Sequence, residues 1–128
     1  MIRLQHPPKK VLIVDDDTTI LRLIGATMSS AGHQIGTATD GLEGLMRFRE
    51  QAWDVIVTDR AMPRMDGEEM TAAIKAIARD VPVILITGLR DSVTREDQYE
   101  AILSKPFRGK ELLALVDRAL QRRAQQPC

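Results

Sequence analysis

The chain has 128 residues, 44% of them hydrophobic, which is enough for one compact core and too little for two. Eighteen basic and eighteen acidic residues give a formal net charge of zero, so the chain lacks the electrostatic attraction that nucleic acid or an anionic membrane surface would require. No apolar stretch approaches the roughly 20 residues that span a bilayer, and the lone Cys128 leaves no disulfide, so we expect a single cytoplasmic domain without a signal peptide or a membrane helix.

Short apolar runs that favour strands alternate with segments of helical periodicity along the whole chain. Five strands are predicted, at 11–14, 34–38, 54–58, 82–87 and 101–103. Helices are predicted after the first, second, third and fifth strands, where apolar residues recur at helical spacing: Ile20, Ile24 and Met28; Leu42, Leu45 and Phe48; Met70, Ile74 and Ile77; Leu112, Val116 and Leu120. Strands that are apolar on both faces and joined through helices predict a parallel sheet with right-handed crossovers.

Acidic residues mark the starts of three of these helices. Asp17 or Thr18 is suited to cap the first, and Asp40 and Asp66, each followed by glycine, open the second and third. No linker or internal repeat interrupts the pattern. We therefore expect residues 1–128 to form one domain, with a core of about 9–122 and no output domain of its own.

The segment 88–100 is the exception to this regular pattern. A fourth helix is expected there, but Val93 is nearly the only apolar side chain before Tyr99. Asp91 or Ser92 could cap a short helix. Because little burial would hold the segment in place, we expect it to be short, polar and mobile.

Five polar side chains fall at the carboxyl ends of the predicted strands. Asp15 and Asp16 follow the first strand, and Asp59 follows the third. Thr87 ends the fourth strand, and Lys105 follows the fifth. In a doubly wound α/β fold with sheet order 2-1-3-4-5 and helices on both faces, ligands bind at this edge, and the first and third strands are neighbours. Three converging carboxylates repel one another unless a cation lies among them, and their oxygen atoms favour Mg²⁺.

The same residues are suited to phosphoryl transfer. A carboxylate beside a divalent ion can attack a phosphoryl group and form an acyl phosphate. Lys105 would neutralise the phosphoryl oxygens, and the Thr87 hydroxyl would donate a hydrogen bond to one of them, with Gly88 leaving open space beside it. Either residue alone is most simply structural, and only their occurrence together with the carboxylates indicates a phosphorylation site.

Five motifs closely resemble the receiver domain of bacterial two-component response regulators, which has a flavodoxin-like fold. They are VLIVDDD from Val11, GHQIGTATDGLEGL from Gly32, DVIVTDRAMPRMDG from Asp54, VPVILITG from Val81 and LSKPF from Leu103. Together they cover nearly the whole chain and are far more specific than any one of them alone. The resemblance implies a phosphorylation-activated switch of a two-component system or phosphorelay. It implies no enzyme beyond self-catalysed phosphotransfer and slow autodephosphorylation.

The resemblance also assigns roles to the carboxylates. Asp59 would be the phosphoacceptor, receiving phosphate from a phosphohistidine on a sensor histidine kinase or a histidine phosphotransfer protein. Asp16 would bind Mg²⁺ directly, and Asp15 would act largely through water. Asp59 itself and the backbone carbonyl of Ala61 would complete the protein ligands of the metal.

By the same resemblance, Thr87 and Lys105 would contact the phosphoryl group, and the Lys105-Pro106 peptide would be cis. The new phosphoryl oxygens would draw both side chains inward and shift the loop that begins at Gly88. The face near the fifth strand and its flanking helices would then act on an unidentified downstream protein. The family also forms homodimers through this face.

The chain departs from the family pattern near this face. Ile102 stands three residues before the lysine, where the family usually has an aromatic side chain, and Tyr99 is close but out of register. The interval from Thr87 to Lys105 is also short. We therefore predict that the segment Gly88 to Tyr99 is disordered or remodelled on phosphorylation, and an amide exchange rate unchanged by phosphorylation would contradict this.

Two other functions are compatible with parts of the sequence. Asp15-x-Asp17-x-Thr19 is similar to the nucleophile motif of haloacid-dehalogenase-type phosphatases, with Asp15 as the nucleophile, and the threonine and lysine could serve as later motifs. Against this, Asp117 lies in the last predicted helix, so no acidic pair follows the lysine, and Asp59 is left unexplained. The other alternative is a docking receiver that works without phosphorylation, whose usual mark, loss of the acceptor or the lysine, is absent.

Overall fold

The computed structural model describes residues 9–125, in which five parallel strands form one sheet in the order β2-β1-β3-β4-β5. The strands are β1 Lys10–Val14, β2 Gln34–Ala38, β3 Val55–Asp59, β4 Val83–Thr87 and β5 Ala101–Ser104. The α-helices are α1 Thr18–Ser30, α2 Gly41–Glu50, α3 Gly67–Ile77 and α4 Gly109–Gln125. The predicted doubly wound, flavodoxin-like α/β fold is confirmed, while Cys128 lies outside the described residues.

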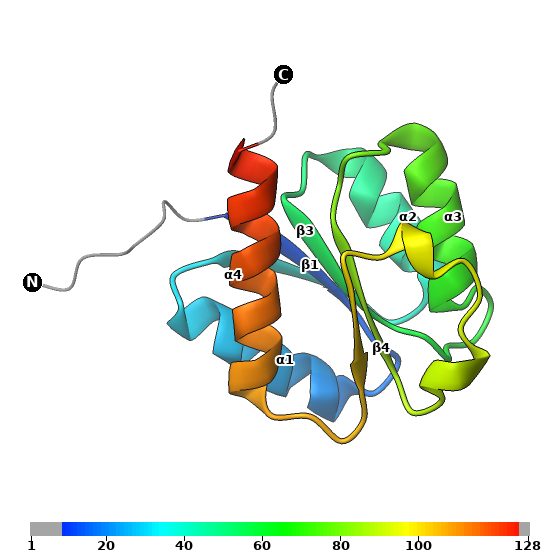
Figure 1. The fold of residues 1–128 in the computed structure, drawn as a ribbon, viewed down its shortest axis with the longest axis horizontal. Coiled ribbons are helices and arrows are strands. Elements are labelled where there is room, and N and C mark those ends of the chain that lie inside the picture. Colours follow the sequence, from blue (N-terminus) through cyan, green and yellow to red (C-terminus); the bar gives the residue numbers. More distant parts are fainter. Residues whose placement is uncertain (1–8, 126–128) are drawn as a thin grey trace, which may run out of the picture.

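The sheet separates two hydrophobic cores. Figure 1 shows α1 and α4 on one face of the sheet and α2 and α3 on the other. Because successive side chains of a strand point to opposite faces, Val11 and Ile13 of β1 enter the core under α1 and α4, whereas Leu12 and Val14 enter the core under α2 and α3. None of these four side chains is more than 1% exposed. β1 thereby contributes side chains to both cores.

Aspartate caps fix where three helices begin. Asp17 is the cap of α1 and accepts hydrogen bonds from two amides of its first turn, at 2.9 and 3.3 Å. Asp40 caps α2, with a bond of 2.8 Å from the Glu43 amide. Asp66 caps α3, where its side chain accepts a hydrogen bond of 2.8 Å from the Glu69 amide. The Glu69 side chain in turn accepts a hydrogen bond of 3.2 Å from the Asp66 amide. These caps confirm the helix starts expected from the sequence.

Burial on both faces holds only for the inner strands. All residues of β3 and β4 are buried, but β2 is exposed or partly exposed except at Ala38, and β5 is at most partly buried. The parallel sheet predicted from apolar strands is confirmed, but β2 and β5 are not buried on both faces as β3 and β4 are. Both lie at sheet edges, where helices cover less of the strand.

The segment between β4 and β5 contains no α-helix among its described residues. Two short 3-10 helices occupy it, η1 Arg90–Ser92 and η2 Glu96–Gln98. The expected cap at Asp91 or Ser92 is wrong, because η1 begins after Leu89 without a side-chain cap. Too few apolar side chains are present to bury a helical face, so the chain crosses beside α3 in an irregular path (Figure 1). Among the described helices, none has both the length and the apolarity that crossing a membrane requires.

Candidate functional site

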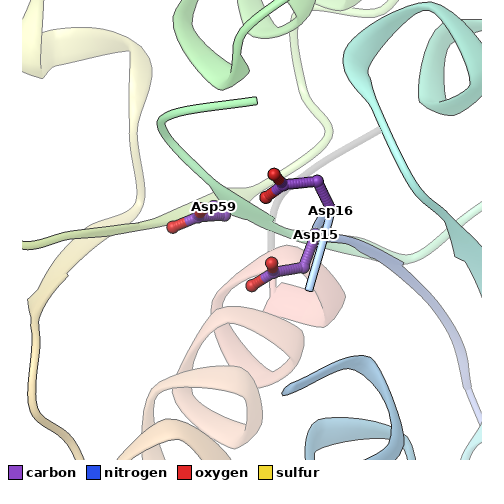
Figure 2. Close-up of side chains that lie close together, drawn as sticks. All are labelled: Asp15, Asp16 and Asp59. Carbon is purple, nitrogen blue, oxygen red and sulfur yellow. The ribbon is translucent and has the colours of Figure 1, made fainter. Parts of the chain in front are cut away.

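The three carboxylates predicted to converge do so. Parallel pairing places Val14 of β1 opposite Thr58 of β3, so the residues that follow them meet at one edge of the sheet. Carboxylate oxygens of Asp15, Asp16 and Asp59 lie within 4.8 Å of one another, and Figure 2 shows the three groups directed toward the same side. Asp15 and Asp59 are buried, whereas Asp16 is exposed at the opening.

Asp15 carries an unsatisfied buried oxygen. Its Oδ1 accepts a hydrogen bond of 2.8 Å from the Asp17 amide, but its Oδ2 is buried and has no partner among the described residues. Burial, with added repulsion from Asp59, raises the pKa of the Asp15 carboxyl to about 6. A buried carboxylate oxygen without a donor is destabilising unless a cation reaches it. The residues present therefore fit a hard divalent ion held by oxygen ligands.

Lys105 is paired with the predicted phosphoacceptor. Its Nζ lies 2.8 Å from Oδ1 of Asp59, and its backbone amide donates to the Thr87 carbonyl at 2.9 Å. Burial alone would lower the pKa of Lys105, but the hydrogen bond and charge of Asp59, together with the other carboxylates, raise it. The lysine is therefore a fixed cation at neutral pH. The Lys105-Pro106 peptide is cis, as the resemblance implies.

Thr87 lies at the end of β4, where it is 3% exposed. Its Oγ1 accepts a hydrogen bond of 3.0 Å from the Leu89 amide. The hydroxyl proton remains available for another acceptor. A Cβ at Gly88 would meet nothing within 4 Å, so the open space expected beside the threonine is present.

The two remaining residues expected to take part in switching lie away from the carboxylates. Ile102 is partly buried in β5 and pairs with Leu85 of β4. Tyr99 packs against the core under α2 and α3, and burial raises the pKa of its phenol to about 12. Neither side chain is among those that contact the carboxylates, so the structure brings together the acidic, threonine and lysine residues but not these two.

An arginine network beside the site was not predicted from the sequence. Arg60 follows Asp59, and its Nε donates to Glu68 at 3.0 Å. Its other nitrogens donate to the Leu89 carbonyl at 3.1 Å and the Ser92 carbonyl at 2.9 Å, and one also contacts the Ser92 hydroxyl. Glu68 in turn accepts from the Thr94 amide at 3.1 Å. Arg60 and its carbonyl partners lie 29 and 32 residues apart along the chain. Such separations follow no helix or strand period, so the contacts could not be predicted from the sequence.

The raised pKa of Asp15 predicts how stability depends on pH in the absence of metal. The folded carboxyl holds its proton up to about pH 6, whereas the ordinary value is 3.8. Stability should therefore fall as the pH rises between these values, because ionisation is costly only in the folded state. At neutral pH, Asp15→Asn should raise the free energy of unfolding by roughly 2 kcal/mol, since asparagine keeps the acceptor for the Asp17 amide.

Urea denaturation in EDTA at several pH values measures this effect. Asp91→Asn is the matched control, because Asp91 is exposed and lies outside the cluster. Mg²⁺ should stabilise the wild type more than Asp15→Asn. If Asp15→Asn is no more stable than the wild type at neutral pH, the buried charge of Asp15 does not lower the free energy of unfolding, and the prediction is contradicted.

The chain is similar to known proteins in sequence family, in sequence and in fold. Residues 11–117 match the family model described as the response regulator receiver domain. The transcriptional regulatory protein GlrR of Escherichia coli is 33% identical over 125 residues, which is 94% of this chain and 28% of GlrR. The response regulator MprA of a Mycobacterium species is 36% identical over 124 residues, which is 91% of this chain and 52% of MprA. The chain thus spans between about a quarter and about half of these relatives.

Solved structures agree with the family match. A CheY-like response regulator receiver domain protein from Methanospirillum hungatei superimposes with a TM-score of 0.88 at 26% identity, covering 94% of this chain and 99% of that one. The chemotaxis response regulator CheY4 of Vibrio cholerae gives a TM-score of 0.82 at 30% identity, covering 88% and 99% of the two chains. Both similarities extend over nearly all of this chain, so the likeness is one of whole domains.

Proposed function

The chain belongs to the receiver domain family of response regulators, and from this premise we propose that Asp59 is its phosphoacceptor. The observation that carries the proposal is the 2.8 Å ion pair between Lys105 and Asp59 beside the carboxylates of Asp15 and Asp16. A phosphorylation-based switch is typical of the family. In this proposal residues 1–128 form one cytoplasmic receiver domain with a core of about 9–122.

We propose Mg²⁺ as the cofactor. Asp15, Asp16, Asp59 and the carbonyl of Ala61 would hold it, and the unpartnered Oδ2 of Asp15 supports a cation at this place. When bound, the ion would neutralise charge on the phosphoryl oxygens and bring the phosphodonor close to Asp59. The exposed position of Asp16 leaves this side open to the donor.

Each protein group then has a defined part in the transfer. A carboxylate oxygen of Asp59 attacks phosphorus, the bond from phosphorus to the histidine nitrogen breaks, and the nitrogen keeps the electron pair. The Lys105 ammonium shifts its ion pair from the Asp59 carboxylate to the phosphoryl oxygens, which carry the negative charge after the transfer. The Thr87 hydroxyl donates to another of these oxygens. Positioning and fixed charge therefore supply the catalysis, as is usual for phosphoryl transfer.

The proposed donor is a phosphohistidine on a sensor histidine kinase or a histidine phosphotransfer protein. Such a partner must cover the surface around Lys105, where a cavity of about 590 Å³ lies between α1 and the start of α4. Its walls are mainly apolar, with Ile20, Leu23 and Phe107 among them. Rapid phosphotransfer from one phosphorylated kinase or histidine phosphotransfer protein of the source organism is expected, and equally slow transfer from all of them would contradict this partner.

A phosphate balance tests the function against both alternatives. With Mg²⁺ and acetyl phosphate, a receiver should gain one covalent phosphoryl group per chain, and it should gain none when EDTA is present from the start. A phosphatase that uses Asp15 should instead release phosphate continuously, and Asp15→Asn should abolish the release. A docking receiver should do neither. Steady turnover without a covalent adduct would refute the proposal.

Slow hydrolysis of the phosphorylated form is expected from two apolar positions. Ala61 and Leu89 lie two residues after Asp59 and Thr87, and neither side chain can hold a water molecule in line with phosphorus. Both residues are exposed, and Leu89 is 71% exposed. The phosphate half-life should therefore be minutes or longer, and Leu89→Gln should shorten it by supplying a polar group. Release of the phosphate from the wild type within seconds would contradict this prediction.

A further inference from the structure

The segment after β4 is tied to the site through a single side chain. The guanidinium of Arg60 donates to the carbonyls of Leu89 and Ser92 at 3.1 and 2.9 Å. Glu68 holds the same guanidinium at 3.0 Å, and the two side chains of this pair are only 21% and 19% exposed. A partly buried arginine with a carboxylate on one side and two carbonyls on the other is a rigid clamp rather than a solvated surface pair.

Leu89 links this clamp to the phosphoryl-binding threonine. The Leu89 carbonyl accepts from Arg60 at 3.1 Å, while the Leu89 amide donates to Oγ1 of Thr87 at 3.0 Å. One peptide segment is therefore fixed at both ends. When Thr87 turns toward a phosphoryl group on Asp59, its bond from the Leu89 amide must lengthen or Leu89 must move with it. Movement of Leu89 in turn requires the Arg60 contacts to give way.

Few other contacts hold residues 89–92, the start of this described segment, to the body of the domain. The side chains of residues 89–92 are all exposed. Besides the bonds from Arg60, residues 90–94 are hydrogen-bonded to neighbouring elements through Glu68 with Thr94 and through Arg90 with the Ile102 carbonyl at 2.8 Å. Since burial contributes little here, the hydrogen bonds of Arg60 have a large share in the position of Leu89.

We propose that Arg60 is a positioning residue, which holds the Thr87 hydroxyl in its resting place through Leu89 and so sets how readily Asp59 accepts phosphate. The inference rests on the proposed function of Asp59 and Thr87. Arg60 does not touch the phosphoryl group; it opposes the movement that brings Thr87 to it. The Arg60–Glu68 pair thereby takes part in the coupling between the site and the segment after β4 in this chain.

Loss of the clamp should increase phosphate uptake. If acceptance requires a rearranged state that is sparsely populated, the uptake rate rises in proportion to the population of that state. Removing charge-assisted hydrogen bonds from the resting state should raise that population, and with it the rate, about fivefold to tenfold. General damage to the fold can only lower the rate, so an increase separates positioning from a merely structural role.

The experiment compares wild type, Arg60→Ala, Arg60→Lys and Arg64→Ala with Mg²⁺ and acetyl phosphate. Arg60→Lys keeps one charged donor and should restore the wild-type rate in part. Arg64→Ala is the matched control, because Arg64 also pairs with a carboxylate, Asp40, at 2.6 Å, but it is not among the residues that contact the segment. In separate samples without phosphodonor, amide exchange at Leu89 should be faster in Arg60→Ala than in the wild type and Arg64→Ala.

The outcomes separate this inference from the proposed function. Faster uptake and faster Leu89 exchange in Arg60→Ala, with Arg64→Ala like the wild type, support the positioning role. If the wild type takes up phosphate and Arg60→Ala takes it up at the same rate or more slowly, the inference is overturned and the proposed function stands. Wild type that gains no phosphate overturns the proposed function and the inference with it.

Discussion

Replacing Lys105 with methionine is expected to slow phosphate uptake about 100-fold, because the fixed cation 2.8 Å from Asp59 is then lost. Methionine retains the apolar stem, so packing around the lysine changes little. The charge that develops on the phosphoryl oxygens would be neutralised from the metal side only. The uptake rate, measured with acetyl phosphate at saturating Mg²⁺, gives the effect directly.

Two variants control for charge and geometry in this measurement. Lys110→Met removes an exposed lysine of α4 and should leave the rate within about twofold of the wild type. Lys105→Arg keeps the charge but changes its shape and reach, so it should retain an intermediate rate. Uptake by Lys105→Met at the wild-type rate would show that the lysine does not stabilise the transferring group.

Gly67→Ala is expected to cost stability because no room exists for a side chain at this position. A Cβ there would lie 2.2 Å from the carbonyl oxygen of Asp59 and 3.1 Å from Cα of Arg60. Both are backbone atoms, so the loop after β3 must move. The free energy of unfolding should fall by roughly 2–3 kcal/mol, and phosphate uptake should fall with it because the acceptor backbone shifts.

Gly88→Ala is the matched control for this substitution. A Cβ at Gly88 would meet nothing within 4 Å, so the same chemical change should alter the free energy of unfolding by less than about 0.5 kcal/mol. Urea denaturation of both variants and the wild type measures the difference. Equal stability of Gly67→Ala and Gly88→Ala would mean that the close contact with Asp59 is not a constraint.

The central strands and the site were predictable for the same physical reason. In a parallel sheet, polar residues that follow apolar strands meet at one edge, so Asp15, Asp16 and Asp59 could be brought together from their places in the sequence alone. The aspartate caps of α1, α2 and α3 were predictable as well, because the residue that caps a helix acts within its first turn.

Other features depend on contacts that sequence pattern does not contain. The exposure of β2 follows from its place at the sheet edge. The irregular path of the segment after β4 follows from polar contacts to Arg60 and Glu68, which lie about 30 residues earlier in the chain. These hydrogen bonds depend on individual polar groups and do not follow the spacing of a helix or a strand, so they could not be predicted from the sequence pattern. The roles of Asp59, Thr87 and Lys105 in transfer stay predictions until phosphate uptake is measured.

The most direct test of the central claim is the intact mass of wild type and Asp59→Asn after incubation with Mg²⁺ and acetyl phosphate. Asparagine keeps the size of the side chain and removes the nucleophilic carboxylate. The account predicts that the wild type gains the mass of one phosphoryl group and that Asp59→Asn gains none. A phosphoryl group gained equally by both proteins, or by neither, would contradict Asp59 as the phosphoacceptor.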